Sequence, residues 1–155
     1  MPYHEFIVGD ERAPLENVTW DKNRIAINGI EVLPQVSIDD DFINYISDSL
    51  AWIKSRGPSD AFHGFGLDLY GYTIIRDKES LNTFKNIISS WKELFLYAPP
   101  EFIITGNYGW EAGSDEGHYE KISVTRNELI ESLSKLIEVI NTALESNQCV
   151  IHFGI

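Results

Sequence analysis

The chain has 155 residues, of which 43% are hydrophobic and 23% are charged. These values are typical of one globular domain with a sizeable core, and no apolar run approaches the roughly 18 residues of a membrane-spanning helix. The formal net charge of −12 argues against nucleic acid and anionic membranes as partners, because both repel an acidic surface.

Strand patterns dominate the start of the chain. His4 to Val8 is short and apolar, and it is predicted to be a strand. Two further strands, 24–27 and 30–33, flank Asn28-Gly29. This pair tolerates positive φ and therefore favours a type I′ hairpin turn.

A helix is predicted next. Ser37 and Asp40 have the spacing of a capping box, and the acidic triplet 39–41 would suit the first helical turn. Gly57 and Pro58 would end the helix. Its apolar face is formed by four residues at helical spacing, Phe42, Ile46, Leu50 and Ile53.

The middle of the chain reads as two strands, 65–70 and 72–75, around Gly71. The clearest helix pattern follows, and Pro99-Pro100 ends it. Its continuous apolar stripe consists of Leu81, Phe84, Ile88, Trp91 and Phe95.

The last third is predicted to hold a strand at 102–105, an exposed connection at 106–117 and a strand at 119–124. Thr125 and Glu128 form a second capping box. The helix behind it would bury Leu129, Leu133, Leu136, Ile140 and Leu144, and Cys149 to Phe153 would close the chain as a strand.

Most neighbouring strands in this order are joined by short connections, which favour antiparallel pairing. We therefore expect a single α+β domain over residues 1–155, with a mainly antiparallel sheet covered by three amphipathic helices. The N-terminus lacks a signal-peptide pattern, so a cytoplasmic protein is expected. The single cysteine, Cys149, lies in an apolar run and is expected to be buried and inert.

The segment WEAGSDEGHYE, residues 110–120, combines acids, glycines and aromatics without a lysine or arginine. Its glycines favour a surface loop, and tyrosine and tryptophan are enriched where proteins bind one another. We therefore predict a partner-binding surface for a basic protein. It consists of Tyr108, Trp110, Glu111, Asp115, Glu116, His118, Tyr119 and Glu120.

A metal site in the same segment is the alternative. In a regular strand Glu116, His118 and Glu120 would point to one side, and a carboxylate–imidazole–carboxylate row can hold a divalent cation weakly. A small hydrolase could use these three residues together with Asp68, which interrupts the apolar run FGLDLY. The sequence contains no nucleophile elbow and no phosphate-binding loop, so neither an enzyme nor a cofactor is expected.

A resemblance extends from Phe65 to the C-terminus. FGLDLYGYTII, SWKELFLYAPPEFIITGNYGW, an acidic loop, YEKISVTRNELIESLSKLIEVI and a final VIHFGI together resemble small bacterial immunity proteins. The resemblance implies a cytoplasmic, non-enzymatic protein that neutralises one cognate toxin domain. Many such toxins are nucleases with basic clefts, which suit an acidic inhibitor. A subunit of a larger assembly remains a third possibility, and the sequence does not predict the oligomeric state.

Overall fold

The computed structural model describes residues 2–11, 15–22, 24–57 and 63–155. These residues form a six-stranded sheet, a three-stranded sheet, a long two-stranded hairpin and four α-helices. The predicted α+β class with antiparallel sheets is confirmed. The described residues hold one more helix than the three that the sequence predicted, because the first helical region is split in two.

The six-stranded sheet has the order β5-β1-β11-β8-β6-β7, and the pairings between its strands are antiparallel. Strands from opposite ends of the chain are neighbours in it, with Phe6 opposite His152. Pairing between consecutive strands was expected. Among the described strands of this sheet only β6 and β7 pair in that way, whereas the small sheet and the hairpin follow the expectation. The strands are β1 (Tyr3–Gly9), β5 (Gln35–Asp39), β6 (Lys54–Arg56), β7 (His63–Phe65), β8 (Tyr72–Ile75) and β11 (Cys149–Phe153).

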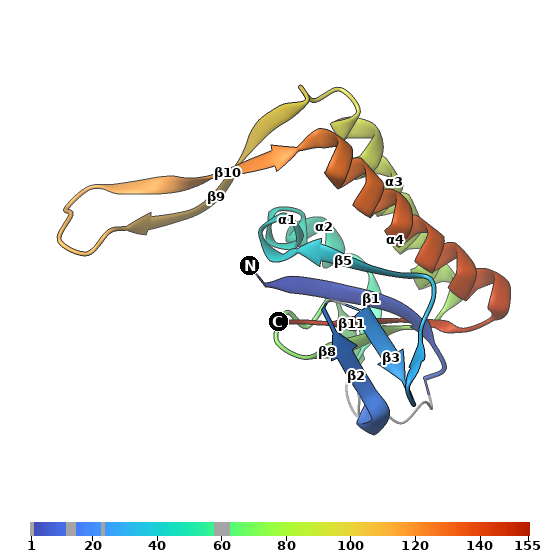
Figure 1. Ribbon diagram of the computed structural model, residues 1–155. Coiled ribbons are helices and arrows are strands. Elements are labelled where there is room, and N and C mark those ends of the chain that lie inside the picture. The colour runs from blue at the N-terminus through green and yellow to red at the C-terminus, as the bar shows by residue number, and fades with distance from the viewer. Residues whose placement is uncertain (1, 12–14, 23, 58–62) are drawn as a thin grey trace.

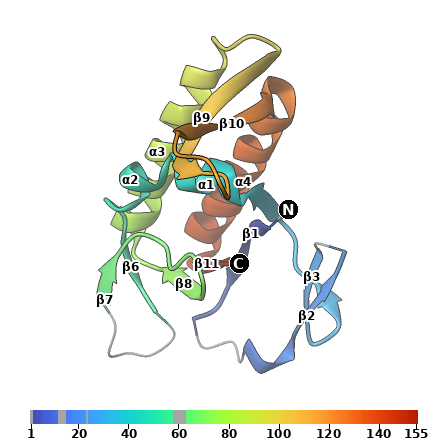
Figure 2. The ribbon, with the colours of Figure 1, turned by 90° about the vertical axis from the view of Figure 1, so that its left-hand side faces the viewer.

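Two long helices, α3 (Lys78–Phe95) and α4 (Arg126–Ser146), lie side by side over one face of this sheet (Figures 1 and 2). The predicted apolar stripes are buried there, although Trp91 and Leu144 are only partly covered. The short helices α1 (Asp40–Tyr45) and α2 (Ser47–Leu50) fill the same core. Its helical contribution includes Phe42, Ile46, Leu81, Phe84, Ile88, Leu129, Leu133, Leu136 and Ile140.

A small sheet packs against β1 and β11 through a second apolar cluster. After the 3-10 turn Leu15–Asn17 it consists of β2 (Val18–Asp21), β3 (Arg24–Ile27) and β4 (Ile30–Glu31). Asn28 and Gly29 both have positive φ, 52° and 77°, so the predicted type I′ turn is confirmed. The second cluster is formed by Ile7, Ile25, Ile151 and Phe153.

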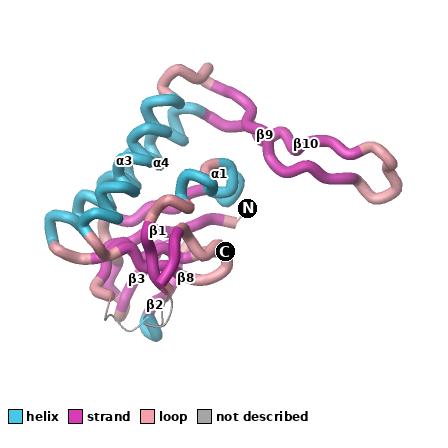
Figure 3. The backbone as a smooth tube through the Cα atoms, turned by 180° about the vertical axis from the view of Figure 1, so that it is seen from behind, coloured by secondary structure: helices cyan, strands magenta, loops and turns pink. Residues whose placement is uncertain are grey.

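A long β-hairpin joins α3 to α4. Its strands are β9 (Glu101–Trp110) and β10 (Gly117–Thr125), and it projects far from the body of the protein (Figures 1 and 3). The sequence predicted an exposed connection over 106–117. That prediction is wrong in extent, because cross-strand pairing continues to Trp110 and Gly117 and leaves only 111–116 as the turn.

The helix predicted to start at Ser37 is another correction. Residues 35–39 form the strand β5, whose Val36 and Ile38 are buried while it pairs with β1. Helix α1 starts at Asp40, capped by the Asp39 carboxylate, which accepts a hydrogen bond from the Asp41 backbone N–H at 2.9 Å. The capping acid was therefore two residues further along than the sequence pattern suggested, and tertiary strand pairing outweighed the local signal.

The strand predicted at 65–70 is also wrong. Strand β7 ends at Phe65, and Gly66, with φ +83°, turns the chain out of extended structure. Residues 66–71 are irregular, and the Asp68 carboxylate there accepts a hydrogen bond from the Tyr70 N–H at 3.1 Å. The second predicted capping box does not form either, because the N-cap Thr125 makes no side-chain hydrogen bond.

Cys149 is buried, as predicted, and burial raises the pKa of its thiol. Within the described ranges no helix is long and apolar enough to cross a membrane.

Leu133→Ala tests the assignment of the buried face of α4. Leu133 is fully buried, so its truncation should leave a cavity and lower the free energy of unfolding by about 2–5 kcal/mol in urea denaturation. Lys135→Ala is the matched control on the exposed side, where its ion pair with Glu131 is solvated and worth less than about 1 kcal/mol. A loss below about 0.5 kcal/mol for Leu133→Ala would contradict this packing.

Candidate protein-binding site

The base of the β9–β10 hairpin is fixed to the body of the protein. Phe102 stacks on Phe95 of α3 with ring centroids 5.3 Å apart, and Ile104 is buried. Arg126, at the start of α4, donates its backbone N–H to the Pro100 carbonyl at 2.9 Å. A two-stranded ribbon alone is only marginally stable in water. These contacts therefore give the projecting part a firm support.

Three aromatic side chains pack together on the projecting part. Tyr108 and Trp110 lie two residues apart on β9, and Tyr119 is directly opposite Tyr108 on β10. The ring of Tyr108 has its centroid 5.4 Å from Trp110 and 5.0 Å from Tyr119, both in edge-on geometry. These rings remain 50%, 65% and 59% exposed in chain order. They form an ordered apolar surface that faces water.

Gly117 makes room for this aromatic cluster. A Cβ atom at Gly117 would lie 2.6 Å from the ring of Tyr108, which is closer than real side-chain contacts. Gly117, which was predicted to favour a loop, therefore leaves space for the Tyr108 ring against the opposite strand.

The hairpin ends in an acidic turn over residues 111–116. The Ser114 N–H donates to the Glu111 carbonyl at 3.0 Å, and the Ser114 hydroxyl bonds the backbone of Glu116. Gly113 supplies a positive φ of 90°. The side chains of Glu111, Asp115 and Glu116 are exposed at this tip. The acids are thus presented by a hydrogen-bonded turn.

The remaining two predicted residues lie further along β10. His118 is exposed and opposite Gly109, so it faces away from the aromatic cluster. Glu120 occupies the β-bulge between Tyr119 and Lys121, and its carboxylate accepts a hydrogen bond from the Asn107 N–H at 3.3 Å. All eight predicted residues therefore lie on one hairpin. They do not form one surface, because the aromatic cluster lies on one face, the acidic turn at the tip, and His118 on the opposite face.

The arrangement required by the metal alternative does not form. Glu116 belongs to the turn, and the bulge at Glu120 interrupts the alternation that would align it with His118. Asp68 lies in the irregular segment before β8. Over the described ranges, no group of three or more histidine, cysteine, aspartate or glutamate residues is placed to hold a metal ion.

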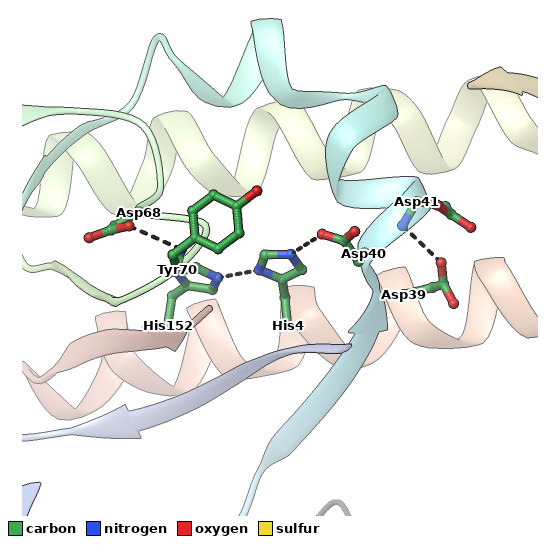
Figure 4. A network of polar contacts seen from close by, with 7 residues as sticks. All are labelled: His4, Asp39, Asp40, Asp41, Asp68, Tyr70 and His152. Carbon is green, nitrogen blue, oxygen red and sulfur yellow. Dashed lines mark hydrogen bonds and ion pairs between the residues drawn. The ribbon is translucent and has the colours of Figure 1, made fainter. Parts of the chain in front are cut away.

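A buried polar network, shown in Figure 4, was not predicted from the sequence. His4 on β1 and His152 on β11 are 0% exposed and stack with ring centroids 5.1 Å apart. His4 Nδ1 lies 2.8 Å from His152 Nε2, and His4 Nε2 lies 2.8 Å from the Asp40 carboxylate at the start of α1. The signal available in the sequence was a histidine within each of two apolar strands, but their pairing depends on the β1–β11 register.

The hydrogen bonds of the network fit a neutral imidazole at His152. The Asp40 carboxylate accepts, so it holds the proton of His4 on Nε2, and His4 Nδ1 then accepts from His152 Nε2–H. His152 Nδ1 has no partner among the described residues, and an imidazole without that proton leaves only a lone pair unsatisfied. Burial, and secondarily the neighbouring His4, lowers the pKa of His152 to about 3. Because both rings are fully buried, a substrate cannot reach them, and we assign the network to the core.

Comparison with protein-family models, with curated proteins and with solved structures found no match. The hairpin is the strongest candidate for a binding surface, because it combines exposed aromatic area, fixed geometry and an excess of carboxylates.

Replacement of His152 by glutamine tests the effect of the network on stability. Since the pKa of His152 is lower in the folded than in the unfolded state, protons bind preferentially to the unfolded chain between about pH 6.5 and pH 3. The free energy of unfolding should therefore fall as pH falls through this window, and His152→Gln should reduce the slope. His118→Gln removes an exposed histidine and is the matched control, so an equal effect of the two variants on the slope would contradict the interpretation.

Proposed function

We propose that this chain is an immunity protein that binds and neutralises a cognate bacterial toxin domain in the cytoplasm. The observation that carries the proposal is the anchored hairpin, which projects an exposed cluster of three aromatic rings beside an acidic turn. The resemblance of the sequence to small bacterial immunity proteins supports the class of partner.

The aromatic cluster supplies what charge alone does not. Large rings that are already packed lose little conformational entropy on binding, and tyrosine and tryptophan are enriched among the residues that contribute most to protein interfaces. Tyr108, Trp110 and Tyr119 hold one another in place before a partner arrives. Such preorganisation favours slow dissociation.

The charge of the hairpin indicates a basic partner. Residues 101–125 carry five carboxylates and one lysine, within a chain of net charge −12. A surface of this sign repels nucleic acid and attracts a protein that binds nucleic acid. A nuclease-like toxin with a basic cleft fits both features, since an acidic hairpin could occupy the position of the phosphate backbone.

The alternative function, a small metal-dependent hydrolase that uses Glu116, His118 and Glu120, receives no support from the described residues. These side chains are exposed and are not arranged as a metal site. The proposed inhibition accordingly needs neither a cofactor nor a catalytic residue, because the chain inhibits the toxin by covering its surface.

Co-expression tests the assignment directly. The toxin domain encoded next to this gene should arrest growth when expressed alone, and this chain should restore growth and co-purify with the toxin. Co-expression of this chain with an unrelated toxin domain is the control for specificity, and it should not restore growth. Full toxicity in the presence of the folded chain would contradict the proposal.

Charge reversal at the tip should slow association. The exposed pair Asp115→Lys/Glu116→Lys should lower the association rate constant for the toxin and weaken its dependence on salt, with unfolding free energy nearly unchanged. Stopped-flow kinetics across a salt series measures both effects. Glu138→Lys/Glu145→Lys makes the same change of net charge on exposed positions of α4. If both double variants behave alike, net charge and not the hairpin steers association.

Removal of the largest ring of the aromatic cluster should instead affect dissociation. Trp110 is 65% exposed, and its ring contact among the described residues is with Tyr108, so Trp110→Ala should leave the core intact. Loss of an aromatic anchor typically costs about 2 kcal/mol or more of binding free energy, which corresponds to a dissociation rate raised about thirtyfold. Trp52→Ala, at another exposed tryptophan outside the hairpin, is the control. An unchanged dissociation rate for Trp110→Ala would exclude the cluster as an anchor.

A further inference from the structure

A groove lies where the base of the hairpin meets the body of the protein. It has a volume of about 290 Å³ and is lined by parts of β1, β5, α1, β9, β10 and α4. In Figure 1 the hairpin leaves the body of the protein above α1. On the hairpin, the lining of the groove comes from Ile104 and residues 122–125 at its base. It is separate from the tip, which the sequence had indicated.

The floor of this groove is apolar. It includes the side chains of Ile38, Phe42, Ile104 and Leu129, which are nearly buried even without a partner. Ile122 on β10 continues this surface along the hairpin. The floor therefore suits an aliphatic chain that enters between the hairpin and α4.

Carboxylates border the same groove from both sides. Asp39 and Glu128 belong to its lining, which contains no lysine, arginine or histidine. Asp41 follows Asp39 at the start of α1. On the hairpin, the Glu120 carboxylate lies on the same face as the lining residue Ile122, because a Cβ atom at Gly106 would come within 3 Å of both side chains. Figure 4 shows Asp40 turned toward His4, whereas Asp39 and Asp41 point away from that network.

The carboxylates of the two sides interact electrostatically. Desolvation is the main reason why the pKa of Asp41 is raised, and the carboxylates of its two chain neighbours and of Glu120 raise it further. The bulge in β10 contributes to this arrangement, because Glu120 occupies the position where the strand register shifts. Among the described residues, no ion pair joins Asp41 or Glu120 to a base.

We infer that the groove at the base of the hairpin receives a lysine- or arginine-bearing segment of the partner protein. The aliphatic stem of the basic side chain lies on the apolar floor, and its charged head lies between the carboxylates of Asp41 and Glu120. Long basic side chains have this division into an apolar stem and a charged end. The inference rests on the proposed function, because it names the chemistry of the partner that binds beside the hairpin.

The groove and the aromatic cluster would then act together. The partner contacts the hairpin at two places: the aromatic cluster at its outer end and the carboxylates at its base. A partner of this kind needs a basic side chain on a projecting segment next to an apolar patch, which narrows the class of toxin surface that fits.

A peptide titration tests the inference without the toxin. The probe is a short peptide of alternating arginine and leucine, compared with the same peptide in which uncharged citrulline replaces arginine. Backbone amide NMR signals of Ile104, Ile122, Ser123 and Leu129 should shift with the arginine peptide and remain in place with the citrulline peptide. Asp41→Asn/Glu120→Gln should weaken binding about tenfold or more, because charge-assisted hydrogen bonds are lost.

A matched variant decides between the groove and the rest of the surface. Glu138→Gln/Glu145→Gln removes two exposed charges on α4 and should bind the arginine peptide nearly as the unaltered protein does. Glutamine at 120 can still accept the Asn107 N–H, so the groove variant keeps the hairpin fold. Unfolding in urea verifies this.

Several outcomes would overturn the inference. Equal weakening by the groove variant and the α4 variant would show attraction to net charge alone, and equal binding of the citrulline peptide would show an apolar site. Shifts confined to residues 108–119 would move the contact to the tip and leave the proposed function standing. Shifts of the groove signals with protein concentration, together with dimers in sedimentation, would assign the groove to a second copy of the chain. Failure of toxin rescue, by contrast, would contradict the proposed function itself.

Discussion

The pairing of β1 with β11 is the constraint on which the structure depends. It joins residues 3–9 to residues 149–153, and both faces of the pair are covered, one by the helices and the other by the small sheet. A strand pair covered on both faces must be almost wholly apolar, and β11 is buried at every position. The contacts also have a large separation in sequence, so the core closes only when the two ends of the chain meet.

The two histidines are the exception within this apolar pair. His4 and His152 point to the helix side of the sheet, and Asp40 satisfies one end of their chain of hydrogen bonds. Buried polar groups that are satisfied in only one register disfavour other registers. A shift of β11 against β1 would separate the two rings, so that His152 would lose its partner in the core and His4 would keep only Asp40. The network therefore specifies the alignment of the strands on which the rest of the fold is built.

Local patterns in the sequence were sufficient for the long helices, for the strands at 4–8, 72–75 and 149–153, and for the turn at Asn28-Gly29. Each is encoded by a periodicity or by a residue with special backbone freedom. The strand β5 was missed because Ser37 and Asp40 imitate a helix start, while pairing with β1 is not local. The sequence indicated which segment forms the candidate binding site but not that this segment is a β-hairpin. Gly113 and Gly117 indicated a loop, whereas Gly117 makes room for the Tyr108 ring on the paired strand. The groove could not be predicted from the sequence, because its lining residues come from six elements that only the tertiary structure brings together.

The hairpin connects two helices that are packed against each other, and this placement has a consequence for divergence. Substitutions in the hairpin between Gly106 and Glu120 touch neither the helix contacts nor the strand pairing of the core, so their effect on the free energy of folding is small. The outer ribbon can therefore accumulate changes while the scaffold stays constant. Two lineages could share the same body and differ in which proteins they recognise, with incompatibility between them arising from a few positions at one end of the molecule.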